Sequence, residues 1–411
     1  MKPKFDQTIN NIQFCTGCGL CAHLCPKDAI KIIEDPRRRH FLFPVIDKEK
    51  CINCGLCFQG CPVHKEKKLD LDTKVYHFRH EDKNKLKESS SGGAFQKIAE
   101  IFLTKENVAV YGAAWSGLKV QHQRITSLDD LSLLLGSKYI QSLVDKNIYT
   151  SIKQDVKDGK EVLFSGTPCQ VAAVHALLNE QEREKVLLIE LLCHGVPNQW
   201  GFDRCIEQEN KVIKGEIISF DFRHKTAYEK DNRQFSYVYQ KENKNYEVVG
   251  QYFFFPYYYF FHSYSIYRDS CYQCNFRNNR LGDIIIGDFW GASKLDKTLP
   301  NDWDRSIMIP LTFKGEDIVH SIGTKKDIPV ADISIYNESL LFDSKKDSGF
   351  VDFYEKIENL KYYKKKRINP HYLKFKIILR NTVKFCINLF LPKKQKKNYT
   401  KIVHFKNKIP N

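Results

Sequence analysis

Two cysteine runs near the N-terminus set the strongest limit on the structure of this 411-residue chain. In each run two residues separate the first three cysteines, three residues precede the fourth, and a proline follows it. This spacing wraps three thiolates around one 4Fe–4S cubane and sends the fourth thiolate to a neighbouring cubane. The runs therefore predict two ligand sets, which are Cys15, Cys18, Cys21 and Cys61 for one cluster, and Cys51, Cys54, Cys57 and Cys25 for the other.

Zinc is the alternative metal that paired cysteines bind. Zinc sites, however, use two short pairs at a longer separation instead of two complete four-cysteine runs. The chain has 14 cysteines in all. Its opening residues are charged and lead into no apolar run, which argues against a secretory signal. We also find no stretch of about 18 apolar residues that could cross a membrane. We therefore expect a cytoplasmic protein whose cysteines are ligands or core residues, not disulfides.

The length of the chain predicts more than one domain, because a single hydrophobic core stops growing beyond about 250–300 residues. A hydrophobic content of 42% indicates a folded protein. We expect an α+β multidomain fold. Its parts are a small bacterial-ferredoxin-like module over residues 1–66, a charged linker over 67–88, a larger α/β domain over 89–345, and a basic helical tail over 346–411.

Within the larger domain, apolar strands alternate with helices, a pattern that favours a sheet covered on both faces. The strands are predicted at Val108–Ala114, Glu161–Phe164 and Val186–Leu192, and the helices at Leu128–Leu135, Asp145–Asp158 and Val171–Leu178. Ligands of such sheets bind outside the carboxyl ends of the strands.

Cys169 and Cys193 both follow strand ends, and Cys271 and Cys274 form a close pair further on. Together they supply four thiolates, enough for one more cluster. A lone cysteine is often a small buried core residue, and that is our interpretation of Cys205 and Cys386.

A serine- and glycine-rich segment, Ser89–Gly93, precedes a helical pattern of apolar residues. Backbone N–H groups at such a helix start suit a phosphate or pyrophosphate. Ser91 as a simple helix N-cap explains the segment equally well, so both interpretations stay open.

Six motifs follow one another in the order found in a known family. They are Ser91-Gly92-Gly93, Gly136-Ser137-Lys138-Tyr139, Gly166-Thr167-Pro168-Cys169-Gln170, Cys193-His194-Gly195-Val196-Pro197, Cys271-x2-Cys274 and Gly282-Asp283-x3-Gly287-Asp288-Phe289-Trp290. Over roughly residues 75–320 the chain thus resembles the beta-subunit family of deazaflavin-coenzyme hydrogenases and dehydrogenases, here with a fused two-cluster ferredoxin module.

The resemblance implies a flavin, FAD or FMN, and iron–sulfur clusters in the larger domain. It implies that Cys169, Cys193, Cys271 and Cys274 hold a third 4Fe–4S cluster. It also implies a flavin site formed by Ser91, Gly92, Gly93, Lys138, Tyr139 and Thr167.

Lys138 and His194 are the candidate catalytic residues. Lys138 either stabilises an anionic reduced flavin or is a solvated surface lysine. His194 either relays protons or makes a structural hydrogen bond. The aromatic run Tyr252–Phe261 either packs in the core or lines a pocket for a planar ligand.

The chain is therefore expected to be an enzyme, a flavin- and iron–sulfur-dependent oxidoreductase. It would pass electrons between its clusters and a two-electron donor or acceptor, with a redox partner such as ferredoxin or a reduced coenzyme. The alternative is a non-catalytic electron-transfer subunit of a larger redox complex. The family includes members associated with surface-polysaccharide genes, and the substrate stays open.

The net charge of +16 comes entirely from the last 51 residues, 361–411, which hold 14 Lys, 2 Arg and no acidic residue. No recognition module for nucleic acid accompanies this charge, so we expect no nucleic-acid partner. Residues 374–390 predict an amphipathic helix between basic clusters. Two interpretations stay open: the helix lies on the inner face of an anionic membrane, or it docks on the domain.

Overall fold

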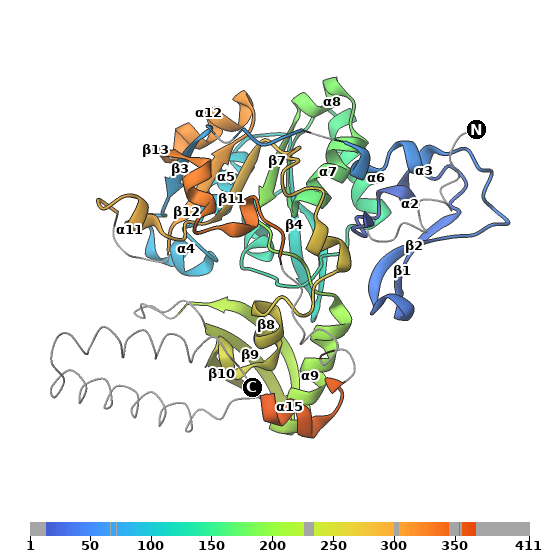
Figure 1. Ribbon diagram of the computed structural model, residues 1–411, viewed down its shortest axis with the longest axis vertical. Helices are drawn as coiled ribbons and strands as arrows, with labels where there is room; N and C mark the ends of the chain where they lie inside the picture. The colour runs from blue at the N-terminus through green and yellow to red at the C-terminus, as the bar shows by residue number, and fades with distance from the viewer. Residues whose placement is uncertain are drawn as a thin grey trace, which may run out of the picture.

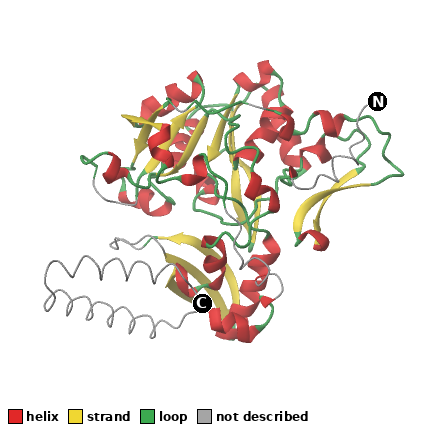
Figure 2. Cartoon of the chain, viewed as in Figure 1, coloured by secondary structure: helices red, strands yellow, loops and turns green. Residues whose placement is uncertain are grey.

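The computed structural model describes residues 14–65, 67–70, 72–225, 234–299, 304–344, 353 and 356–366. Within these residues the chain forms an N-terminal module, an α/β domain around an eight-stranded sheet, and a region built on a three-stranded sheet (Figure 1). The predicted α+β multidomain fold is confirmed, with helices and strands mixed in each region (Figure 2). No helix in the described part of the chain is long and apolar enough to cross a bilayer. Cys386 and the predicted tail helix lie outside the described residues.

The N-terminal module repeats one turn twice. The short helices α2 (Leu20–His23) and α3 (Leu56–Gln59) each follow a glycine in the left-handed region, Gly19 with φ 85° and Gly55 with φ 78°. Glycine adopts this conformation without steric cost. A hairpin lies between the two turns: β1 (Ile30–Asp35) pairs antiparallel with β2 (Phe41–Ile46).

The central sheet of the α/β domain has the strand order β13-β3-β12-β11-β7-β6-β4-β5. The neighbours β11, β7, β6 and β4 are parallel, and the remaining pairs are antiparallel. The strands are β3 (Lys74–Phe78), β4 (Val108–Ser116), β5 (Lys119–Ile125), β6 (Glu161–Gly166), β7 (Val186–Leu191), β11 (Ile284–Asp288), β12 (Ser306–Pro310) and β13 (Thr324–Pro329).

Helices cover both faces of this sheet, which explains why its central parallel strands are mostly apolar. Along β4, Val108 and Val110 pack with α5 and α12 on one face, while Ala109 and Tyr111 pack with α6 and α7 on the other. The helices of this domain are α4 (Lys83–Glu88), α5 (Ala94–Leu103), α6 (Lys146–Lys157), α7 (Pro168–Leu177), α8 (Glu180–Glu184), α11 (Ala292–Leu295), α12 (Phe313–Ile322) and α13 (Val330–Ser334), with the 3-10 turns η4 (Leu128–Leu134) and η7 (Glu338–Leu340).

The prediction of a linker over residues 67–88 is wrong in part. Lys74–Phe78 forms β3 inside the central sheet, between β12 and β13, and Lys83–Glu88 forms α4. Both partners of β3 come from residues more than 200 positions later in the chain. The predicted helix at Leu128–Leu135 is a 3-10 helix, η4.

The third region packs an aromatic core beneath the α/β domain (Figure 1). Its antiparallel sheet joins β8 (Glu216–His224), β9 (Gln234–Lys241) and β10 (Lys244–Gln251). Phe220 and Phe235 stack across β8 and β9 with ring centroids 5.8 Å apart. Cys205 is fully buried in this core, as predicted. The surrounding helices are α9 (Gln199–Ile213), α10 (Pro256–His262) and α15 (Leu360–Lys366), with η5 (Tyr252–Phe254) and η6 (Asp269–Gln273).

The N-terminal module is docked on the α/β domain through its cysteine turns. The Tyr149 hydroxyl donates to the carbonyl of Cys18 at 2.6 Å, and the Gln141 amide donates to the carbonyl of Thr16 at 3.0 Å. Tyr149 lies on α6 and is fully buried. The module is therefore held by hydrogen bonds to the turns that carry its candidate cluster ligands.

Candidate functional site

Six of the eight N-terminal cysteines form two groups of electrostatically interacting thiols, and each group combines residues from both runs. Burial, and then the nearby thiols, raise the pKa of Cys18 and Cys57. For Cys57 and Cys61 the pKa rises to about 11, so these thiols ionise at neutral pH only beside a bound cation. The neighbours that act electrostatically on one another are Cys18 with Cys61 and Cys15, and Cys57 with Cys54 and Cys25.

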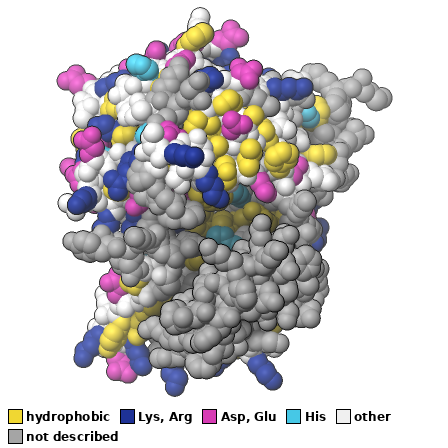
Figure 3. All heavy atoms as spheres, turned by 60° about the vertical axis from the view of Figure 1, so that its left-hand side comes forward, with side chains coloured by type: hydrophobic (Ala, Val, Ile, Leu, Met, Phe, Trp, Pro, Cys, Tyr) yellow, Lys and Arg dark blue, Asp and Glu magenta, His cyan; other side chains and the backbone are white. Residues whose placement is uncertain are grey.

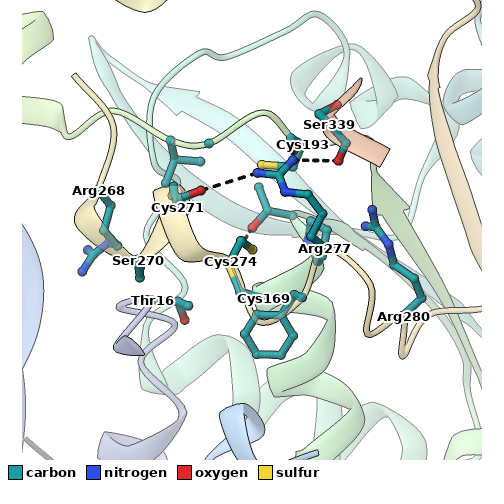
Figure 4. Close-up of a pocket in the computed structure, with 15 residues that line it drawn as sticks. Thr16, Cys169, Cys193, Arg268, Ser270, Cys271, Cys274, Arg277, Arg280 and Ser339 are labelled. Atoms are coloured by element: carbon teal, nitrogen blue, oxygen red, sulfur yellow. Dashed lines mark hydrogen bonds between the residues drawn. The ribbon is translucent and has the colours of Figure 1, made fainter. Parts of the chain in front are cut away.

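Four further cysteines line one small cavity, together with Thr16 of the N-terminal module (Figure 4). Cys169 lies in the first turn of α7 after β6, and Cys193 lies in the loop after β7. Because β6 and β7 are parallel, their carboxyl ends bring these two residues to one edge of the sheet. Cys271 in η6 and Cys274 at its C-terminal end complete the group. The structure thus brings together the four cysteines of the predicted third set.

The four thiols of this small cavity are protonated at neutral pH unless a positive group binds them. Burial raises the pKa of Cys169 to about 12, and it also raises the pKa of Cys193 and Cys274. Among the described residues, no three or more His, Cys, Asp or Glu side chains are arranged to hold a metal ion. The four thiols instead surround a space, the arrangement that a polynuclear iron–sulfur cluster requires.

Three arginines also line the small cavity of the four cysteines, which suits a group of net negative charge. Arg277 donates to the carbonyls of Cys193 at 3.1 Å and Ser339 at 2.7 Å (Figure 4). Its Nε lies 3.1 Å from an Asp343 carboxylate oxygen. Arg280 pairs with the fully buried Glu190 at 3.2 Å. The remaining arginine is Arg268.

A second, larger cavity of about 460 Å³ lies at the same edge of the sheet. Its volume falls within the range of about 300–1,000 Å³ that is usual for ligand sites. Figure 3 shows apolar and histidine side chains in a hollow between the α/β domain and the region below it. The loops that line the cavity come from five of the six sequence motifs, and they are residues 89–91 with 93, 136–139, 165–167 with 170, 193–197, and 287–288 with 290.

The serine- and glycine-rich segment lies at this cavity, but its members have different roles. Ser91 and Gly93 line the cavity. The Ser91 hydroxyl donates to the Arg305 carbonyl at 2.9 Å, and the N-cap of α5 is Gly93, with φ 88°. The interpretation of Ser91 as the N-cap is therefore wrong. Gly92 packs against backbone, since an added Cβ would lie 2.2 Å from the Phe78 carbonyl oxygen.

Two cationic side chains line the large cavity. Burial lowers the pKa of Lys138 to about 8, and its Nζ donates to the Leu135 carbonyl at 2.6 Å. Arg223 donates to Asp288 at 2.9 Å and to the Tyr139 hydroxyl at 3.2 Å. Lys138 is therefore a partly buried lysine that lines the cavity.

Thr167 and His194 lie where the two cavities meet. Thr167 lines both cavities, and its hydroxyl oxygen lies 3.2 Å from Cys169 Sγ. His194 lines the larger cavity, with its ring 5.2 Å from that of Trp290 and Nε2 3.4 Å from the Ser339 hydroxyl. Burial lowers the pKa of His194 to about 4, so its ring is neutral at pH 7.

The aromatic run Tyr252–Phe261 serves both purposes that the sequence left open. Tyr257 and Phe260 are fully buried in the aromatic core. Tyr252, Tyr258 and Phe261 line the large cavity. The flat walls that these rings provide suit a planar ligand.

The residues of the large cavity that were missed at the level of sequence include two buried polar ones. Asn337 and Tyr267 are fully buried and line the cavity. Within the described residues, neither amide atom of Asn337 nor the hydroxyl of Tyr267 has a hydrogen-bond partner. Buried polar groups are nearly always hydrogen-bonded, so these atoms fit a ligand that both donates and accepts. Asn337 belongs to no motif, and no sequence signal marks it.

Comparisons with known proteins agree with this geometry. Residues 14–65 match a family described as "4Fe-4S dicluster domain", and a second family of that description matches residues 43–92. Residues 159–335 match the family of the C-terminal part of the beta subunit of coenzyme F420 hydrogenase/dehydrogenase. No curated protein matches the chain.

Among solved structures, one chain of the F420-reducing NiFe hydrogenase complex from Methanosarcina barkeri, studied by xenon derivatization, is similar. The similarity covers 72% of this chain and 91% of that chain, with 15% sequence identity and a TM-score of 0.41.

The two cysteine groups of the module and the α/β domain behind them define an iron–sulfur electron-transfer protein of the oxidoreductase class. More narrowly, residues 14–65 resemble a 4Fe–4S dicluster domain, and residues 159–335 resemble the C-terminal part of the coenzyme F420 hydrogenase/dehydrogenase beta subunit. The predicted resemblance is confirmed.

Proposed function

We propose that this chain is a flavin- and iron–sulfur-dependent oxidoreductase. Single electrons pass between an external carrier, such as ferredoxin, and the two N-terminal clusters. They continue through a third cluster held by Cys169, Cys193, Cys271 and Cys274 to a flavin in the large cavity. There they meet a substrate or coenzyme that exchanges two electrons.

The observation that carries this proposal is one short loop that borders both cavities. Cys193, Gly195 and Val196 line the cavity of the third cysteine group and also the large cavity. Gly195 lets the loop run close to the ring of Tyr267, since an added Cβ would lie 2.4 Å from that ring. A group held by the four cysteines and a ligand in the large cavity would thus be separated by little more than this loop.

The lining of the large cavity fits a flavin. The aromatic side chains of Tyr258 and Trp290 offer faces for a planar ring system. The unpartnered amide of Asn337 offers a donor and an acceptor, which match the N–H and carbonyl groups on the polar edge of that ring. A bound flavin would supply the conversion between one-electron and two-electron transfer.

The cationic residues of the cavity have distinct tasks in this scheme. Lys138, with a pKa of about 8, is mostly protonated at pH 7, and it stabilises negative charge that develops beside it. Arg223 is oriented by Asp288 and Tyr139, and it contributes to the attraction for an anionic ligand. Both side chains act by position and charge.

The test is anaerobic purification followed by assay of cofactors and donors. We expect about twelve iron and twelve acid-labile sulfide per chain from three cubanes, and release of FAD or FMN on denaturation. Ferredoxin, NAD(P)H or a reduced deazaflavin, tried in turn, should bleach the cluster absorbance. A chain that takes up clusters but never a flavin contradicts the proposal.

A variant separates flavin binding from cluster binding. Asn337→Leu removes the amide that lines the cavity and should lower the flavin content at least severalfold, with iron unchanged. The matched control is Asn147→Leu, because Asn147 is exposed on α6. Equal flavin content in both variants would show that the amide does not contact the flavin.

The description of the matched family as a beta subunit favours one alternative. In it the chain carries electrons for a substrate site on a partner chain. The isolated, reconstituted chain separates the two functions: turnover of a small two-electron acceptor supports the enzyme, and cluster reduction without any turnover supports the electron-carrier role.

A further inference from the structure

Four Lys or Arg side chains are buried in the described part of the chain, namely Lys225, Arg268, Arg277 and Arg280. Three of them pair with a carboxylate: Lys225 with Asp304 at 3.0 Å, Arg277 with Asp343 at 3.1 Å, and Arg280 with Glu190 at 3.2 Å. Arg268 is 1% exposed. Among the described residues it has no carboxylate partner, and its Nε has no hydrogen-bond acceptor.

A buried charge without a partner costs several kcal/mol even after relaxation of its surroundings. Arg268 nevertheless stays protonated, because a guanidinium does not lose its proton in proteins. A nearby negative charge would offset this cost, and the described side chains do not supply it as a carboxylate.

Arg268 lies where the N-terminal module meets the third cysteine group. Its Nη2 donates to the carbonyl of Leu42 in the module at 2.9 Å and to Gln141 in the α/β domain at 2.8 Å. Its guanidinium lies over the ring of Phe43, 4.7 Å from the centroid. Its side chain also lines the small cavity of the third cysteine group (Figure 4). An added Cβ on Gly17 would lie 2.6 Å from Nη2, so the cysteine turn closes directly over this cation.

Cysteines of two candidate clusters surround Arg268. Burial lowers its pKa, and the thiolates of Cys15 and Cys18 on one side and of Cys169 and Cys271 on the other oppose that shift. The first two belong to the ligand set of one module cluster and the last two belong to the third set. No other buried cation of the described chain stands between two such sets.

We propose that Arg268 is a positioning residue for electron transfer, a fixed positive charge shared by one N-terminal cluster and the third cluster. This proposal rests on the proposed function. A cubane with four thiolates is anionic, and it gains one more negative charge on reduction. Arg268 stabilises the reduced form of both neighbours, so it raises their midpoint potentials. In each transfer one cluster loses one electron and the other gains it, and no proton or further reactant is needed.

The test is a redox titration of the cluster-loaded protein, followed by electron paramagnetic resonance. Arg268→Gln should lower the equilibrium constant for cluster reduction at least tenfold, which is a shift of about 59 mV toward more negative potential. Arg268→Lys keeps the charge and should stay close to the unmodified protein. The matched control is Arg38→Gln, because Arg38 lies over the same Phe43 ring but is partly exposed and pairs with Asp35.

Each outcome decides the proposal. A shift in Arg268→Gln that is absent from Arg268→Lys supports it. A shift no larger than that of Arg38→Gln, or equal shifts in the Gln and Lys variants, overturns it. If Arg268→Gln and Arg268→Met lose iron while Arg268→Lys keeps it, the site needs the charge and the proposal stands. Iron loss in the Lys variant as well means a packing role and overturns it. Absence of flavin in the unmodified protein contradicts the proposed function alone, since both clusters still report on Arg268. Absence of a third cluster contradicts the proposed function and overturns the shared charge as well.

Discussion

The N-terminal module and the third cysteine group build candidate cluster sites from the same thiol donors in opposite ways. In the module, each run supplies three ligands within seven residues and sends its fourth to the other site. In the third group, Cys169, Cys193 and the Cys271–Cys274 pair come from three separate segments of the chain. The first arrangement depends on local turns and the second on the sheet.

The surroundings of the two arrangements differ accordingly. In the module, left-handed glycines such as Gly19 and Gly55 shape the turns, and Ile52 and Leu56 in the second run are more than 40% exposed. Around the third group, Arg277 and Arg280 are buried and held by carboxylates. In the proposed function, the module would therefore meet the external electron carrier, and the third group would pass electrons inward.

The largest effect should come from removing one ligand of the third group. Cys169→Ser takes one of four thiolates from the cavity, and we expect it to lower the iron content by about four atoms per chain, with the two module clusters retained. Iron and sulfide assays on the anaerobically reconstituted protein measure this loss.

Cys205→Ala is the matched control for that experiment, because Cys205 is fully buried in the aromatic core and lines neither cavity. Its iron content should equal that of the unmodified protein. An unchanged iron content in Cys169→Ser would contradict a third cluster, and loss of all iron would mean that the two arrangements do not form independently.

A smaller effect is expected from neutralising the carboxylate that holds Arg280 at the small cavity of the third cysteine group. Glu190 is fully buried, pairs with Arg280, and accepts from the backbone N–H of Leu281 at 2.9 Å and of Gly282 at 2.8 Å. Glu190→Gln leaves Arg280 buried without a counter-charge, so stability should fall by about 3–5 kcal/mol.

Thermal unfolding of the cluster-loaded Glu190→Gln variant and of the cluster-loaded unmodified protein measures this loss of stability. The control is Glu34→Gln, which removes a partly exposed carboxylate that pairs with His40 in the module hairpin. That change should alter stability by about 0.5 kcal/mol or less. Similar unfolding midpoints for Glu190→Gln and the control would show that the buried pair does not stabilise the third site.

The same contrast explains how far the sequence could lead. The module ligands were predicted because their spacing is local, and β4, β6 and β7 were predicted because they are mostly apolar. The strand β3 was missed, since it is a five-residue strand whose partners lie more than 200 residues away. Asn337 and Arg268 escaped for a similar reason: their importance comes from distant segments that surround them, and nothing in their own neighbourhood marks it.

The smallest expected effect concerns the exposed ion pairs between the two regions. Arg39 of the module pairs with Asp269 at 3.1 Å, and Lys146 of α6 pairs with Asp28 at 2.9 Å. All four side chains are more than a third exposed, and exposed pairs contribute about 0–1 kcal/mol. Lys146→Met should therefore lower stability by less than about 1 kcal/mol, and the difference should shrink in high salt because exposed charges are screened.

Tyr149→Phe is the informative comparison, since it removes the hydrogen bond to the Cys18 carbonyl. It leaves that acceptor unsatisfied, which should cost about 1–3 kcal/mol of stability. Denaturant unfolding at low and high salt measures both variants. If the lysine variant loses more stability than the tyrosine variant, the module is held by its surface charges and not by its cysteine turns.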